Sequence, residues 1–188
     1  MAIEPSPAEL AARSAIADVI ALYCHFLDRR RWERMVECFH PEATYRFATI
    51  IGGWREFVYM ARAGIDPLRI SHHQIGNIQI RVTGGKAVSE TYFTARHRVA
   101  ANTPSDALFP GTGQEYETVL AGRYIDQFER RDGDWRIVHR TGVTDWRFEA
   151  PASDAGLFDQ PPEWRGSVGP DDPALIAFAK SRAARLGF

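Results

Sequence analysis

The stretch GRYIDQFERRDGDWRI, residues 122–137, decides the fold that this sequence predicts. We assign one strand to residues 117–130 and a second to residues 135–148. Between them, Asp132-Gly133-Asp134 is typical of a tight hairpin turn, because glycine and aspartate accept the positive φ angles that such turns need. This part of the chain is therefore expected to be antiparallel sheet.

Two more strands are predicted on the N-terminal side of this hairpin. Residues 70–82 alternate between apolar and polar side chains, and residues 87–101 form a long strand candidate after a Gly84-Gly85 turn. Residues 102–116 contain two prolines and two glycines and are expected to be a loop. Four sequential strands joined mostly by short turns predict a curved antiparallel sheet.

The first quarter of the chain predicts helices. In residues 8–27 apolar side chains recur every three or four positions, and Ser6, Pro7 and Glu9 form a capping box at the start. A short second helix is expected to end at His40-Pro41, because proline disfavours helix in the residue before it. A strand over residues 42–50, a break at Gly52-Gly53 and a third helix from Trp54 to about Gly64 follow.

Helices that precede a sheet pack together on one of its faces, which predicts an α+β domain. The chain has 188 residues, enough for one domain with a substantial core. We expect residues 1–150 to form that domain. Residues 151–188, which are rich in proline and end in a short helix at about 174–186, are expected to extend it or to form a subunit contact.

Composition excludes several classes of protein. Lys plus Arg is 23 and Asp plus Glu is 24, so the net charge of −1 gives no electrostatic reason to bind nucleic acid or an anionic membrane. A hydrophobic content of 45% excludes a disordered chain, and 12% aromatic residues predict a core or a pocket lined by rings. The sequence has no phosphate-binding glycine motif and no metal-ligand spacing among its histidines.

The sequence lacks the features that direct a protein to secretion or into a membrane. The N-terminus lacks the basic start and apolar run of a signal peptide, and no apolar stretch approaches the ~18 residues of a membrane span. Cys24 and Cys38 lie far from any CxxC motif and are expected to be free thiols in a reducing compartment. These features predict a cytoplasmic protein.

Three stretches resemble the SnoaL-like branch of the nuclear transport factor 2-like superfamily: residues 23–28 (YCHFLD), residues 71–77 (SHHQIGN) and residues 122–137. The resemblance covers residues 10–150. It implies a cone-shaped α+β barrel, in which a curved antiparallel sheet and the N-terminal helices enclose a pocket. It also implies an Asp/His pair like that of the cofactor-free lyases in this superfamily, such as hexachlorocyclohexane dehydrochlorinase and the bile-acid dehydratases.

On this resemblance, Asp28 and His73 are the candidate catalytic dyad. Histidine accepts protons near neutral pH, and a carboxylate on one ring nitrogen fixes the tautomer and stabilises the imidazolium. His72 is expected on the opposite face of the strand, but a shift of one residue in the strand register would make it the base instead of His73.

Other residues complete the candidate site. Tyr23 is expected to donate a hydrogen bond to a developing charge, and Tyr45 to do so from the first strand. Arg140 resembles a pocket arginine of the dehydrochlorinase and is expected to stabilise a departing anion. The remaining candidate substrate-binding residues are Trp54, Phe57, His72, Tyr92 and His97.

These features predict a cofactor-independent lyase that dehydrates, or eliminates from, a hydrophobic aromatic or polycyclic small molecule. Diarylpropane lyases, which release formaldehyde, resemble the chain at the same level, and isomerases of the superfamily are a close alternative. Two further alternatives are a non-catalytic subunit of a ring-hydroxylating dioxygenase and a protein that binds a small molecule without turnover. No metal and no cofactor are expected. The expected assembly is a homodimer or homotrimer, and the tail with Phe158, Pro162 and Trp164 covers the pocket or reaches a neighbouring subunit.

Overall fold

The computed structural model describes residues 4–153, 156, 159–161 and 164–185. Contacts within the chain divide it into two compact units, Met1–Pro151 and Ala152–Phe188. The first unit contains all six strands and the two helices α1 and α2, so the candidate site is described within it.

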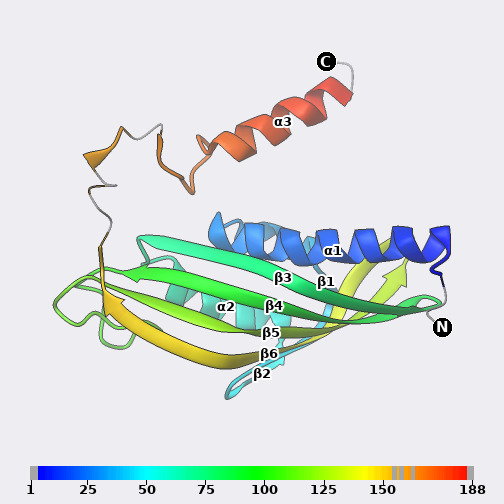
Figure 1. Cartoon of the computed structure of the whole chain (residues 1–188), viewed down its shortest axis with the longest axis horizontal. Helices are drawn as coiled ribbons and strands as arrows, with labels where there is room; N and C mark the ends of the chain where they lie inside the picture. The colour runs from blue at the N-terminus through cyan, green and yellow to red at the C-terminus, as the bar shows by residue number, and fades with distance from the viewer. Residues whose placement is uncertain (1–3, 154–155, 157–158, 162–163, 186–188) are drawn as a thin grey trace. The chain divides into compact units, whose positions relative to one another are not determined.

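The core of the first unit is a six-stranded sheet in the order β2-β1-β6-β5-β4-β3 (Figure 1). The four C-terminal strands form the predicted antiparallel meander. Interruptions of the strand register lie between Gly76 and Ile78, Ala121 and Gly122, and Gln127 and Phe128, and such bulges bend a sheet. The strands are β1 (Phe39–Phe47), β2 (Ile50–Gly53), β3 (Ile70–Thr83), β4 (Lys86–Val99), β5 (Tyr116–Arg131) and β6 (Asp134–Pro151).

The β5–β6 hairpin confirms the prediction from residues 122–137. Arg131 pairs with Asp134, and the two residues between them have positive φ angles, 52° at Asp132 and 93° at Gly133. Positive φ at both central positions is the turn that matches the twist of the flanking strands.

The predicted antiparallel meander is joined by one parallel pair that the sequence did not predict. The strand β1 runs parallel to β6, with Tyr45 opposite Arg140 and Phe47 opposite Gly142. Because α2 and four further strands separate β1 from β6 in sequence, no tight turn dictates their relative direction. The sheet is therefore mixed, and the first predicted strand lies against the last one.

The N-terminal helices are α1 (Pro7–Asp28), the 3-10 helix η1 (Trp32–Glu37) and α2 (Trp54–Ile65). Ser6 caps α1 by accepting a hydrogen bond from the Glu9 backbone N–H. Figure 1 shows α1 lying along the sheet, where it packs against β3 and β6. The helix α2 packs against β1 and β2.

Two predicted boundaries between these elements are wrong. The segment 39–41 does not end a helix but begins β1, and Pro41 lies where the β1–β6 pairing is interrupted, so no ladder hydrogen bond is lost. Gly52-Gly53 does not interrupt a strand either, because both glycines belong to β2 and pair with β1.

One helix of the described residues, α1, is long and apolar enough to cross a membrane by length and composition alone. It has 22 residues and contains an 18-residue window of mean hydropathy 1.4. The core helix of a globular protein passes the same test, and α1 contributes buried side chains such as Ile16, Ile20 and Phe26 to the core.

The second unit contains the helix α3 (Pro173–Arg185). Asp172 caps α3, since its carboxylate accepts hydrogen bonds from the backbone N–H groups of Ala174 and Leu175. Phe158 and Pro162, which belong to the predicted tail contact, lie outside the described residues.

Candidate active site

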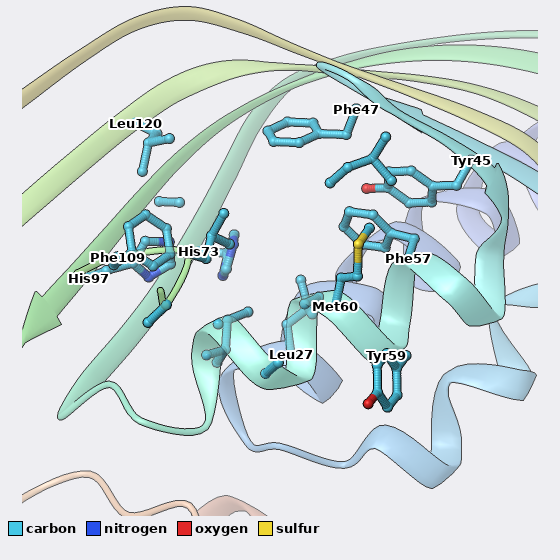
Figure 2. A pocket seen from close by; sticks show the side chains of 18 of the residues that line it. Leu27, Tyr45, Phe47, Phe57, Tyr59, Met60, His73, His97, Phe109 and Leu120 are labelled. Atoms are coloured by element: carbon cyan, nitrogen blue, oxygen red, sulfur yellow. The ribbon is translucent and has the colours of Figure 1, made fainter. Parts of the chain in front are cut away.

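A cavity of about 390 Å³ lies within the first unit (Figure 2). Its volume is near the lower end of the range for small-molecule sites, about 300–1,000 Å³. Figure 2 shows two ends: a histidine end, with His73, His97 and Phe109, and a tyrosine end, with Tyr45, Phe47 and Phe57. Among the described lining residues Asp106 is the one carboxylate, and none is Lys or Arg. The cavity is thus suited to an uncharged, apolar compound.

Asp28 is the last residue of α1 and one of the few acidic side chains in the core. A carboxylate at a helix C-terminus faces the negative end of the helix dipole, so this position is unfavourable unless other groups compensate. Asp28 accepts three hydrogen bonds: from the His73 ring at 2.7 Å, the His73 backbone N–H at 2.7 Å and the Ser71 hydroxyl at 3.1 Å. Burial alone would raise the pKa of Asp28, but the hydrogen bonds from His73 and Ser71 lower it below its usual value. Asp28 is therefore ionised at neutral pH.

His73 lies on β3 and lines the cavity. The ionised Asp28 carboxylate can only accept, so Nδ1 of His73 donates the hydrogen bond between them. The ring proton of the neutral tautomer is therefore on Nδ1. Nε2 then carries a lone pair and can take a proton from a bound molecule. The structure thus brings Asp28 and His73 together in the arrangement of an oriented general base.

Tyr23 and Tyr45 also line the cavity, and their hydroxyl oxygens are 3.0 Å apart. The Tyr45 ring stacks on Phe57, with centroids 3.6 Å apart and nearly parallel planes. Burial is the main cause that raises the pKa of Tyr45 to about 12, and it also raises the pKa of Tyr23 well above its ordinary value. Both phenols therefore remain protonated and can donate hydrogen bonds at neutral pH.

Arg140 does not reach the cavity surface, contrary to the expectation that it contacts a departing anion. It is fully buried and forms a two-pronged ion pair with Asp126, at 2.6 and 2.7 Å. Its guanidinium carbon lies 4.0 Å from the ring centroid of Tyr23 and 4.3 Å from that of Tyr124. Asp126 pairs with Arg140 across β5 and β6, and the two tyrosine rings separate this ion pair from the ligand space.

Three predicted substrate-binding residues are not among the described residues that line the cavity: Trp54, His72 and Tyr92. Trp54 is buried, stacks on Phe39 and donates a hydrogen bond to the Pro41 carbonyl oxygen, so it is a core residue. His72 is exposed, because successive side chains of β3 alternate between the two faces of the sheet. Tyr92 is exposed for the same reason on β4. Phe57 and His97 do line the cavity, as expected.

Several residues of the site were not predicted from the sequence. Ser71 supports Asp28, and its position two residues before His73 places both on one strand face, which was a usable signal. Asp126 holds Arg140, but no sequence spacing links two residues on neighbouring strands. Phe109 belongs to a loop, and nothing in its local sequence predicts that it closes the histidine end.

The described part of the chain has no group of three or more His, Cys, Asp or Glu side chains arranged to hold a metal ion. The described lining residues with polar side-chain groups are His73, His97, Asp106 and the tyrosines Tyr23, Tyr45, Tyr59 and Tyr124. This set supports proton transfer and hydrogen-bond donation.

Comparison with known proteins places these features in context. Residues 8–141 match the SnoaL-like domain family. An uncharacterized protein of Mycobacterium tuberculosis is 28% identical over 139 residues, which are 72% of this chain and 86% of that protein.

Two solved structures show the same fold. A scytalone dehydratase-like protein from Novosphingobium aromaticivorans is 21% identical, with a TM-score of 0.62 over 81% of this chain and 96% of that chain. A hexachlorocyclohexane dehydrochlorinase from Novosphingobium barchaimii is 19% identical, with a TM-score of 0.61 over 81% of this chain and 97% of that chain. At these identities the likeness establishes the cone-shaped α+β fold.

Proposed function

The chain belongs to the SnoaL-like domain family, and from that premise we propose that it is a cofactor-independent lyase acting on a small hydrophobic aromatic compound. The reaction proposed is a dehydration or another β-elimination. One observation carries the proposal: the Asp28 carboxylate fixes Nδ1 of His73 at 2.7 Å, so that Nε2 is the basic atom of a ring that lines a largely apolar cavity.

In the proposed step, Nε2 of His73 takes a proton from a carbon atom of the substrate. Asp28 stabilises the imidazolium that forms, and positioned acid–base help of this kind contributes ~10²–10⁴-fold in rate. The leaving group departs with the electrons of its bond to carbon, and the proton held on His73 then neutralises it. The products are an alkene and, in a dehydration, water, and the base is restored.

The tyrosine pair serves as the donor for the leaving group in this proposal. Tyr23 and Tyr45 are protonated at neutral pH and line the cavity, and Figure 2 shows Tyr45 at the end opposite His97. Arg140 acts as a positioning residue rather than a catalytic one, because its charge reaches the ligand only through the ring and hydroxyl of Tyr23 and Tyr45. Hydrogen bonds donated from a buried, fixed group are effective in stabilising developing charge.

The size and lining of the cavity support a small aromatic substrate. A cavity of about 150 Å³ accommodates benzene, so about 390 Å³ leaves room for a compound of two fused rings with small substituents. Phe57 and Phe93 line the cavity, and aromatic rings favour offset-stacked or edge-to-face contacts with an aromatic ligand.

The proposal is tested by incubating the metal-stripped protein with a panel of aromatic and bicyclic alcohols and following the formation of alkene. We expect turnover of at least one compound, reduced by ~10²–10⁴-fold in His73→Gln. The matched control is His72→Gln, since His72 is the adjacent, exposed imidazole. Saturable binding without loss of any compound would contradict the proposal, as would co-purification with an iron–sulfur subunit.

Cellular location and assembly complete the proposal. We place the enzyme in the cytoplasm, and two free buried thiols, Cys24 and Cys38, support a reducing compartment. We also propose a homodimer or homotrimer. Light scattering on the full chain measures the assembly directly, and a monomeric mass at micromolar concentration would contradict it.

A further inference from the structure

His97 is a second imidazole in the cavity, and the Asp28–His73 dyad does not use it. Its ring lines the cavity, with its centroid 5.4 Å from that of His73 and 4.9 Å from that of Phe109. The residue is 4% exposed, and its Nδ1 is buried without a hydrogen-bond partner in the described part of the chain. Figure 2 shows this ring at the histidine end, beside Phe109.

The unpaired Nδ1 indicates which tautomer His97 adopts. A neutral imidazole has one N–H donor and one acceptor nitrogen, and a buried N–H without a partner is rarer and less tolerable than an unpaired acceptor. The proton is therefore on Nε2. Since the ring lines the cavity, this N–H group is the one available to a bound molecule.

The surroundings of His97 keep it uncharged. Burial is the main cause that lowers the pKa of His97 to about 3; the His73 imidazole, when protonated, and Arg147 act in the same direction, while Asp28 opposes them. An uncharged imidazole gives a substrate oxygen a hydrogen bond without giving up its proton. Such a donor stabilises an enolate that forms from a carbonyl group.

We propose that His97 donates a hydrogen bond from Nε2 to a carbonyl oxygen of the substrate, and that the substrate class is uncharged ketones with a leaving group on the β-carbon. This inference rests on the proposed function of His73 as the base. The His73 nitrogen takes the proton from the carbon next to the carbonyl group, and the electrons of that C–H bond move onto the carbonyl oxygen. The enolate, held by His97, then re-forms the C=O bond and expels the β-substituent, which the His73 proton neutralises.

The lining of the cavity agrees with a neutral ketone rather than an anion. None of the described lining residues is Lys or Arg, and the one carboxylate, Asp106, would repel an anionic group. A neutral carbonyl group needs one hydrogen-bond donor. His97 supplies that donor, and its ring centroid lies 5.4 Å from that of His73, the proposed base. The two imidazoles thus face one C–H and one C=O of the same molecule.

The test uses indanone and indane, bicyclic compounds that differ in the carbonyl group alone. We expect the wild-type protein to bind indanone about tenfold more tightly than indane, as one satisfied hydrogen bond predicts. The ratio of the indane Kd to the indanone Kd should fall to near one in His97→Leu. It should stay near tenfold in His97→Gln, whose side-chain amide is also a neutral donor. Nitrogen NMR should show the His97 proton on Nε2 at neutral pH, with a shift on adding indanone but none on adding indane.

Failure of this inference and failure of the proposed function give different results. A proton on Nδ1 of His97, or an unchanged binding ratio in His97→Leu, overturns the inference even if the enzyme eliminates water from alcohols. Conversely, a protein without turnover that shows the Nε2 tautomer and the binding ratio retains the carbonyl site and loses the lyase proposal. Thermal unfolding of both variants shows whether a lost ratio comes from a lost fold.

Discussion

Two hydrogen-bonded pairs, each of an aspartate and a basic side chain, have similar geometry and differ in their access to the cavity. Asp28 and His73 are 2.7 Å apart, with side chains that are 11% and 7% exposed, and His73 lines the cavity. Asp126 and Arg140 are 2.6 Å apart, and both side chains are fully buried. The first pair can exchange a proton with a ligand, whereas the second is sealed behind the rings of Tyr23 and Tyr124.

The difference also lies in what each cationic partner can do. His73 is charged only after it takes up a proton. Burial alone would lower the pKa of Arg140, but Asp126 raises it well above its ordinary value, so this guanidinium is permanently charged. Position relative to the cavity, rather than the strength of the pair, separates a group that transfers protons from one that supplies a fixed charge.

The largest expected effect comes from breaking the accessible pair, Asp28 and His73. Asp28→Asn removes the acceptor that fixes the His73 tautomer, so we expect kcat to fall by about 10³–10⁴-fold, as happens when an orienting aspartate becomes an amide in other enzymes. The measurement is steady-state turnover of any substrate found by the panel. Asp18→Asn, an exposed change on the same helix, is the control. An activity loss below tenfold would show that Asp28 does not orient the base.

The next largest effect is expected from breaking the sealed pair, Asp126 and Arg140. Asp126→Asn leaves Arg140 as a buried charge without its counterion, so the free energy of unfolding should fall by about 3–5 kcal/mol. Urea unfolding measures this loss. Asp145→Asn breaks the half-exposed ion pair with Arg123 and should cost no more than about 1 kcal/mol. Equal losses in the two variants would remove the distinction between sealed and accessible pairs.

A third prediction concerns pH and sharpens the description of the accessible region. The pKa of His97 is about 3 in the folded state, whereas an unfolded histidine titrates near 6.5. The unfolded chain therefore binds a proton that the folded chain does not, and stability falls as pH decreases below about 6.5. Between pH 7.5 and 5.0 the contribution is about 2 kcal/mol.

The measurement is urea unfolding at both pH values in the wild type and in His97→Phe. The variant should lose about 2 kcal/mol less than the wild type over this interval. His72→Gln, a change at an exposed imidazole, should behave like the wild type. An identical pH dependence in His97→Phe and the wild type would mean that His97 is protonated inside the cavity.

The smallest effect concerns the contact that links the two regions. Tyr45→Phe removes one hydroxyl of the Tyr23–Tyr45 pair and keeps the ring that stacks on Phe57. A double-mutant cycle with Tyr23→Phe should give a coupling energy of about 0.5–1.5 kcal/mol in urea unfolding. A coupling energy of zero would show that the two hydroxyl groups act independently.

The sequence predicted those parts of the fold that depend on neighbours in the chain. The β5–β6 turn at Asp132-Gly133 and the Ser6 cap of α1 are local, and both are confirmed. The parallel pairing of β1 with β6 depends on residues far apart in sequence, so no local pattern could have indicated it. The sequence therefore predicted the antiparallel meander but not this parallel pair.

The same distinction holds for the site. Strand alternation predicted that His72 and His73 lie on opposite faces, and the family resemblance brought Asp28 and His73 together. Arg140 was expected at the cavity surface, but its partner Asp126 and the covering tyrosine rings come from other elements. Sequence reasoning gives the face of a strand to which a side chain belongs; it does not give the depth at which that side chain lies beneath others.

The parallel contact between β1 and β6 also has a consequence for the order of folding. Thr44 and His139, which are hydrogen-bonded across this contact, are 95 residues apart in the chain. A ribosome that adds about 5–20 residues per second needs roughly 5–20 s to make that interval. During this time β1 can pair with β2 but not with β6, so the strand that carries Tyr45 lacks its second neighbour in the sheet. The sheet closes only when β6 emerges, so the ligand site is among the last parts of the protein to form.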